Sequence, residues 1–140
     1  MLFRSPEYSA RGMMRRYHVE AVCTTDDPID SLEYHIQTRE SGFEIKMLPT
    51  WRPDKAMAVE VPADFRAYVE KLAEVSGVAI SNFDDMIAAL RKRHDFFAEQ
   101  GCKLSDHGIE DSMQKTIQML KSKLYLIRYM VERNWLRKKS

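Results

Sequence analysis

Leu48-Pro49-Thr50-Trp51-Arg52-Pro53-Asp54-Lys55-Ala56 combines three charged side chains, an indole and two prolines within nine residues. It follows residues 43–48, in which apolar and polar side chains alternate as they do in a strand. Because each proline fixes φ and removes a backbone donor, we expect the strand to stop here. The polar side chains would then lie on a stiff loop at the carboxyl end of a strand, where α/β proteins bind ligands. The alternative is a rigid surface turn whose tryptophan packs and whose charges are solvated.

Two more predicted strands also end in reactive side chains. Residues 18–23 form a predicted strand that ends in Thr24-Thr25-Asp26-Asp27-Pro28. Helix capping by Asp27, with proline at the first helical position, explains Asp27 well and Asp26 poorly. Residues 102–105 form the third strand, which ends in Asp106-His107-Gly108.

His107 is the histidine with the best setting for a functional role. It lies beside an acid at a strand end, so its imidazole is a candidate metal ligand or proton carrier. His18 opens a strand, and His35 and His94 lie in predicted helices. We interpret these three histidines as structural.

Helical periodicity and capping residues predict helices in the segments before and between the strands. Helices are expected from residue 9 to about 17, 28 to about 39, 63 to 75, and 81 or 82 to Gly101. Two inner faces are predicted: Phe65, Tyr68, Val69 and Leu72 in one helix, and Phe83, Ile87, Leu90, His94 and Phe97 in the next. The basic cluster at residues 91–93 is expected to be a solvated face. Cys23 and Cys102 are predicted to be buried free thiols.

The order strand, polar strand end, helix, repeated three times, predicts an α/β fold with parallel strands. Reactive side chains at all three carboxyl ends match a (β/α)₈ (TIM-type) barrel, which needs eight strands and typically ~250 residues. A chain of 140 residues is therefore expected to be a small doubly wound sheet or part of something larger. A long helix with a broad apolar stripe is predicted over residues 111–136.

The net charge and the apolar content of the sequence indicate which classes of binding partner to expect. The net charge is +1, which gives no general attraction to nucleic acid or acidic membranes. There is no apolar run of the length that spans a membrane, and the first residues lack the apolar segment of a secretory signal. We therefore expect a cytoplasmic protein without a nucleic-acid or membrane partner.

Four motifs together resemble the uronate (glucuronate) isomerase family. They are YSARGMM (8–14), TTDDPIDSL (24–32), LPTWRPDKA (48–56) and GCKLSDH (101–107), which lie within a similar region from about residue 7 to 110. The resemblance implies an amidohydrolase-like fold, a distorted (β/α)₈ barrel. It also implies interconversion of D-glucuronate with D-fructuronate, and of D-galacturonate with D-tagaturonate. This aldose–ketose isomerisation moves a proton between C1 and C2 through an enediol, with a divalent metal such as zinc nearby.

The resemblance also suggests roles for individual residues. Arg52 is the expected catalytic and substrate-binding residue, because its planar fork can bind a carboxylate or a developing enediolate. Asp26 and Asp106 would accept hydrogen bonds from sugar hydroxyls or orient their neighbours. His107 would be a metal ligand or a catalytic contact to the substrate. Trp51 would form a wall of the sugar site, or it would pack. Asp54 and Lys55 are expected to pair with each other at the loop.

The sequence also departs from the family pattern. It has no counterpart of the amino-terminal His-x-His metal motif, the later His-Ile-Gly-Ala-Leu-Arg segment or the Asp-Ser-Arg of the last strand. At most one candidate zinc ligand, His107, is present, whereas a catalytic zinc site takes three. We therefore expect residues 1–140 to form a single partial-barrel domain, about strands three to five of the barrel. Residues 7–110 would be its core and 111–136 its C-terminal helix.

These expectations lead to alternative functions. In the first, the chain belongs to a uronate isomerase and acts with segments supplied by a complementing chain or a longer gene product. In the second, it is a catalytically inactive fragment, or an oligomerising module that forms a homo-oligomer through exposed apolar faces. A third possibility, a basic helical adaptor that uses residues 111–140, rests only on a charged tail, and such tails are usually solvated.

Overall fold

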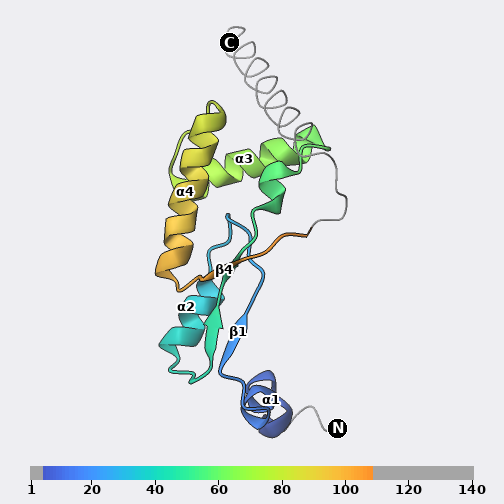
Figure 1. Ribbon diagram of the computed structural model, residues 1–140, viewed down its shortest axis with the longest axis vertical. Coiled ribbons are helices and arrows are strands. Elements are labelled where there is room, and N and C mark those ends of the chain that lie inside the picture. Colours follow the sequence, from blue (N-terminus) through green and yellow to red (C-terminus); the bar gives the residue numbers. More distant parts are fainter. Residues whose placement is uncertain (1–4, 109–140) are drawn as a thin grey trace.

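The computed structural model describes residues 5–108, so the predicted helix over residues 111–136 lies outside the described residues. The elements are η2 (Pro6–Tyr8), α1 (Ala10–Arg16), β1 (Ala21–Cys23), α2 (Glu33–Glu40), β2 (Lys46–Leu48), β3 (Thr50–Trp51), η3 (Asp54–Met57), α3 (Pro62–Ser76), α4 (Phe83–Glu99) and β4 (Leu104–Ser105). Figure 1 shows α1 beside the start of β1, with α3 and α4 at the opposite end of the molecule. None of the helices in the described part has the length and apolar character needed to cross a membrane.

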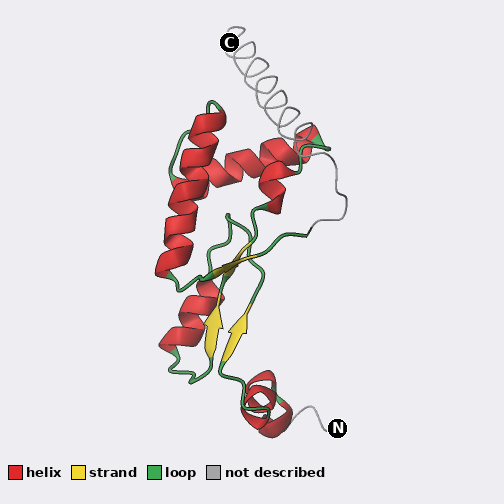
Figure 2. Ribbon diagram, viewed as in Figure 1, coloured by secondary structure: helices red, strands yellow, loops and turns green. Residues whose placement is uncertain are grey.

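Parallel pairing joins all the described strands, as the sequence predicts. β1 pairs with β2, with Ala21 opposite Lys46 and Cys23 opposite Leu48. β3 pairs with β4, with Trp51 opposite Ser105. Figure 2 shows β1 and β2 as two neighbouring yellow arrows. A parallel bridge between Asp26 and Trp51 continues the pairing beyond β1 to β3, so the segment of β2 and β3 pairs with the β1 segment and with β4.

The prediction that the middle strand stops at its prolines is wrong. Pro49 separates β2 from β3, but the ladder resumes one residue later. Thr50 O accepts from Asp26 N at 3.1 Å, and Arg52 N donates to Asp26 O at 3.0 Å. A proline removes only its own N–H, so the neighbouring residues still form ladder hydrogen bonds. Trp51 therefore lies in a strand, and Arg52 directly follows it.

The core lies where α3 and α4 pack together. The predicted inner face of α3 is confirmed, because Phe65, Tyr68, Val69 and Leu72 are all buried. The predicted face of α4 is wrong in part. Only Phe97 of that set is buried, and His94 is exposed; the other buried residues of α4 are Met86, Ala89 and Arg93.

Arg93 is buried although it belongs to the basic cluster that we expected to be solvated. Its Nε donates to Pro28 O and its Nη2 to Asp30 O, each at 2.7 Å, and its guanidinium lies 4.3 Å from the Phe96 ring centroid. Burial lowers the pKa of Arg93, but a guanidinium keeps its charge in proteins. Arg93 therefore fastens the loop after β1 to α4.

Helix α2 begins at Glu33 rather than at Pro28, which corrects the predicted helix start. Asp27 caps a turn instead: Asp27 Oδ1 accepts from Ile29 N at 3.2 Å, and Asp27 N donates to Asp30 Oδ2 at 2.8 Å. Leu32 then adopts a left-handed conformation (φ 56°) before the helix. The Asx turn competes with helical hydrogen bonding, as short polar side chains commonly do.

The cysteine prediction is confirmed in one respect and wrong in another. Both cysteines are free, but Cys23 is exposed and Cys102 is half-buried. Cys23 is an end residue of a three-residue strand whose first and last side chains both face solvent. Alternation therefore places it on the outer side.

Helix α1 has no buried residue, and a surface pair holds it against the loop before β2. Arg15 donates from Nε to Glu44 Oε1 and, at 3.0 Å, from Nη2 to Glu44 Oε2. The guanidinium groups of Arg11 and Arg15 also lie over the Phe43 ring. The hydrogen bond from Arg15 lowers the pKa of Glu44 to about 2.

This pair predicts a pH dependence. Because the pKa of Glu44 is depressed on folding, the pair stabilises the chain above pH 4.5 and loses that contribution as the pH falls towards 2. We expect Arg15→Ala to raise the pKa of Glu44 towards its ordinary 4.5, as measured by ¹³C NMR of the side-chain carboxyl. Arg16→Ala is the control, since Arg16 contacts Tyr8 instead. A pKa unchanged by Arg15→Ala would contradict the pairing.

Candidate functional site

Three strand ends meet in register and bring three predicted site residues together. Arg52 N donates to Asp26 O at 3.0 Å, and Asp106 N donates to Trp51 O at 3.1 Å. The backbone ladder therefore sets Asp26, Arg52 and Asp106 side by side at the carboxyl ends of parallel strands. Such ends are where α/β folds place their chemistry.

Arg52 and Asp106 form a two-pronged ion pair across this edge. Arg52 Nε donates to Asp106 Oδ1 at 2.9 Å and Nη2 to Asp106 Oδ2 at 2.5 Å. The hydrogen bond from Arg52 lowers the pKa of Asp106, and the reciprocal bond raises the pKa of Arg52. Both groups are therefore charged, and both side chains are more than a third exposed. Nη1 and the second Nη2 proton of Arg52 remain on the other edge of the fork.

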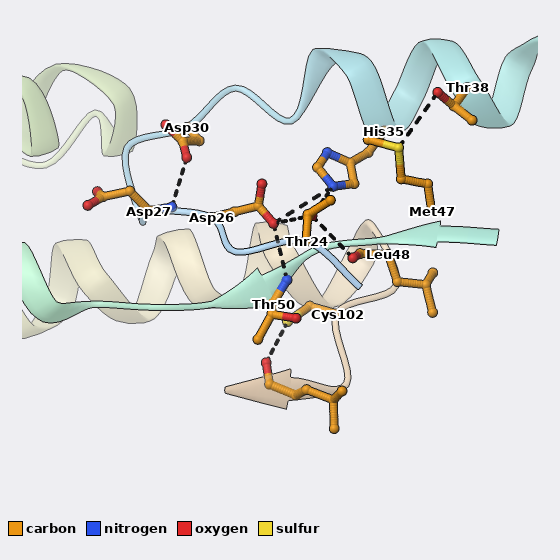
Figure 3. Close-up of polar contacts among 11 residues, drawn as sticks. Thr24, Asp26, Asp27, Asp30, His35, Thr38, Met47, Leu48, Thr50 and Cys102 are labelled. Carbon is orange, nitrogen blue, oxygen red and sulfur yellow. Dashed lines mark hydrogen bonds and ion pairs between the residues drawn. The ribbon is translucent and has the colours of Figure 1, made fainter. Parts of the chain in front are cut away.

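Asp26 has a more enclosed carboxylate, with a side chain 12% exposed. Thr24 Oγ1 donates to its Oδ2 at 2.6 Å, and Thr50 N donates to the same oxygen at 3.2 Å. His35 Nε2 lies 3.7 Å from Oδ2 and 2.7 Å from Thr24 Oγ1. Figure 3 shows this cluster between α2 and the line of β2 and β3. Asp26 was predicted as a site residue from the sequence, whereas Thr24 and His35 were not.

His107 does not contact Arg52 or Asp106 through any hydrogen bond that the described residues form. Its Nδ1 lies 2.8 Å from Asp54 Oδ1, and Gly108 N donates to Asp54 Oδ2 at 2.6 Å. The expected Asp54–Lys55 pair is wrong, because Lys55 Nζ lies 3.5 Å from Asp27 Oδ2. Asp54 instead orients His107. The position of Asp54 next to Pro53, in the stretch that the sequence singles out, was a signal that it could orient a site residue.

Trp51 is packed rather than open to a ligand. Its side chain is 9% exposed, and its ring makes edge contacts with His94 at 5.3 Å and Phe97 at 5.0 Å between centroids. The packing alternative therefore describes its observed surroundings. By packing on α4, Trp51 fixes the strand from which Arg52 projects.

The described residues do not form a metal centre by themselves. Within residues 5–108, no three His, Cys, Asp or Glu side chains come together as ligands. Asp54 occupies Nδ1 of His107, which leaves Nε2 as one ligand atom, whereas a catalytic zinc site takes three protein ligands and an open position. His107 could supply at most one member of a larger ligand set.

Known proteins similar to this chain are uronate isomerases. The uronate isomerase of Bacteroides thetaiotaomicron is 94% identical over 106 residues, which are 76% of this chain and 23% of the relative. That of Phocaeicola vulgatus is 91% identical over the same shares. The crystal structure of the Thermotoga maritima uronate isomerase is 37% identical, with a TM-score of 0.69 over 86% of this chain and 28% of that one.

These matches cover most of this chain but only a part of each relative. This chain spans about a quarter of the length of the curated relatives that it matches. The crystal structure of the glucuronate isomerase from Caulobacter crescentus gives the same TM-score of 0.69 at 28% sequence identity. The model of one family, described as glucuronate isomerase, matches residues 1–138. The chain therefore belongs to the glucuronate isomerase family.

Proposed function

We propose that this chain forms the substrate-binding edge of a uronate isomerase, and that its parallel strands are neighbouring strands of a (β/α)₈ barrel. One observation carries the proposal: the backbone ladder places Asp26, Arg52 and Asp106 side by side at the carboxyl ends of their strands. In barrels of this class, substrates bind at that face. Membership of the family supplies the class of substrate, a uronate sugar.

Arg52 is proposed as the residue that receives negative charge from the substrate. Asp106 holds one edge of its guanidinium, so the fork is fixed before the substrate binds. The other edge can bind the uronate carboxylate, or the oxygen on which charge develops in the enediol, with two parallel N–H donors. Since Asp106 is ionised, it serves as an acceptor and an orienting group rather than as an acid.

The remaining site residues are proposed to bind the substrate or to carry a proton. Asp26 would accept a hydrogen bond from a sugar hydroxyl. His107, held by Asp54 through Nδ1, would present Nε2 to the substrate as a proton carrier or as one metal ligand. Trp51 would support Arg52 from behind through its packing on α4. The metal itself stays outside the proposal, because the described residues do not make a ligand set for it.

A chimeric enzyme tests this proposal. In the full-length uronate isomerase of Bacteroides thetaiotaomicron, the matched 106-residue segment would be replaced by the residues of this chain. We expect conversion of D-glucuronate to D-fructuronate with kcat/KM within about tenfold of the parent enzyme, which is a barrier change of about 1.4 kcal/mol. A soluble, folded chimera without turnover would overturn the proposal and favour a non-catalytic module. Light scattering of the 140-residue chain would then report whether it forms a homo-oligomer.

A further inference from the structure

His35 is a buried histidine to which the proposed function gives no task. It is 6% exposed and lies in the first turn of α2, with its backbone N–H bonded to Leu32 O at 3.0 Å. Leu32 is itself buried against Trp51 and Phe97, so the start of this helix is fixed. His35 Nδ1 is buried and has no hydrogen-bond partner among the described residues. A buried polar atom of this kind calls for an explanation.

The surrounding donors and acceptors determine where the proton of His35 lies. Thr24 has one hydroxyl proton, and its Oγ1 lies 2.6 Å from Asp26 Oδ2 and 3.4 Å from Leu48 O. Both oxygens can only accept, and the proton goes to the nearer and charged one, Asp26 Oδ2. Thr24 Oγ1 must then accept from His35 Nε2, at 2.7 Å. The single proton of a neutral imidazole is thus used on Nε2, and the unpartnered Nδ1 carries none.

These hydrogen bonds fix the position of one carboxylate oxygen of Asp26, Oδ2. The hydrogen bonds that described residues donate to the Asp26 side chain, from Thr24 Oγ1 and Thr50 N, both go to Oδ2. In Figure 3 both dashed lines converge on that oxygen, while the other oxygen of Asp26 points away from Thr24 and Thr50. Two fixed donors on one oxygen stop the carboxylate from rotating. The second oxygen, Oδ1, is therefore presented in one orientation.

We propose that His35 and Thr24 are positioning residues for Asp26. His35 Nε2–H donates to Thr24 Oγ1, Thr24 O–H donates to Asp26 Oδ2, and Oδ1 is thereby held to accept a hydroxyl of the sugar acid. This inference rests on the proposed function, because it takes Asp26 as a substrate-binding residue. Neither positioning residue touches the substrate, so both act through the carboxylate.

Matched substitutions separate the relay from simple packing. His35→Gln places an amide nitrogen near the position of Nε2 and keeps the donor to Thr24. His35→Asn reaches only to about the position of Nδ1 and loses that donor. Thr24→Ser keeps the hydroxyl, whereas Thr24→Val keeps the shape and removes it. The relay predicts that the glutamine and serine variants resemble the parent and that the asparagine and valine variants do not.

The first measurement is made on the 140-residue chain and needs no substrate. In ¹⁵N NMR spectra of the histidine side chains at pH 7, we expect the proton of His35 on Nε2, slow to exchange, with Nδ1 unprotonated. Thr24→Val should shift or lose that proton resonance, and Thr24→Ser should keep it. A proton on Nδ1, or an Nε2 proton indifferent to Thr24→Val, would overturn the relay.

The second measurement uses the chimera and asks whether the relay acts through Asp26. We expect His35→Asn and Thr24→Val each to lower kcat/KM about tenfold, the loss of roughly one hydrogen bond to a charged group, with the glutamine and serine variants near the parent. In an Asp26→Asn background, Thr24→Val should cost no more than about twofold, because coupled residues are not additive. Equal losses in both backgrounds, or equal activity of His35→Asn and His35→Gln, would overturn the positioning role. An inactive parent chimera would count against the proposed function, and the NMR result would still decide the relay.

Discussion

Arg52→Ala is expected to lower kcat/KM of the chimera by at least about 100-fold, the usual effect of losing a positioned donor to developing charge. The structure gives the reason. Asp106 holds one edge of the guanidinium at 2.9 and 2.5 Å, so the proposed substrate would meet a fork that is already oriented. Alanine removes both donors and leaves Asp106 as an isolated carboxylate. Steady-state kinetics with D-glucuronate measures the loss.

Two controls separate this effect from damage to the fold. The side chains of Arg52 and Asp106 are more than a third exposed, so we expect Arg52→Ala to leave the midpoint of urea unfolding nearly unchanged, because solvent screens such a pair. Arg15→Ala removes a second two-pronged arginine–carboxylate pair, between α1 and the loop before β2, and should leave turnover unchanged. Turnover near normal in Arg52→Ala would remove Arg52 from the site.

Loss of the Arg52 fork should also be visible without activity. Because the hydrogen bond from Arg52 lowers the pKa of Asp106, that pKa should rise in Arg52→Ala. Carboxyl ¹³C titration of the 140-residue chain measures this shift. Arg52→Lys is the informative companion, since a lysine keeps the charge but cannot reproduce two parallel donors.

Phe97→Ala is expected to have the largest effect on stability, a loss of about 3–5 kcal/mol in the free energy of unfolding. Phe97 is fully buried and lies in a cluster with Leu32 and Trp51. Its ring contacts Trp51 edge-on at 5.0 Å between centroids. A cavity here separates α4 from β3 and from the start of α2. Urea denaturation followed by circular dichroism gives the difference.

An exposed aromatic residue provides the comparison for this substitution. Tyr34 of α2 is 67% exposed, so Tyr34→Ala should change the free energy of unfolding by no more than about 0.5 kcal/mol. If Phe97→Ala is too unstable to purify, Phe97→Leu creates a smaller cavity and should give an intermediate loss. A loss below about 1 kcal/mol for Phe97→Ala would contradict the packing described here.

Local signals in the sequence were sufficient for much of the architecture. The α3 face at Phe65, Tyr68, Val69 and Leu72 follows from helical spacing, and it is buried. Asn82 caps α4 by accepting from Asp85 N at 2.8 Å, which agrees with the predicted helix start. Ser9 likewise caps α1. These features depend on residues within one or two turns of each other, so periodicity and side-chain chemistry suffice to predict them.

The start of α2 was mispredicted because of a local Asx turn at Asp27, whereas the other errors discussed here concern interactions between distant segments. Pro49 was expected to end its strand, but the partner strand supplies hydrogen bonds on either side of it. Arg93 was expected in solvent, but two carbonyl groups 63 and 65 residues away satisfy its donors. His94 was placed inside because spacing alone does not say which of two adjacent stripes meets the neighbouring helix.

The order of residues in the chain was enough to predict the parallel strands with their polar ends and to recognise the family, and the role of Arg52 stays a prediction. Folding in three dimensions was needed to pair Arg52 with Asp106, Asp54 with His107, and His35 with Thr24. Each of these pairs joins residues on different elements, and its existence depends on the register of the strands and the seating of the helices. Strand register and helix position are set by the packing of the whole core. That packing involves residues far apart in the chain, so a short stretch of sequence does not predict it.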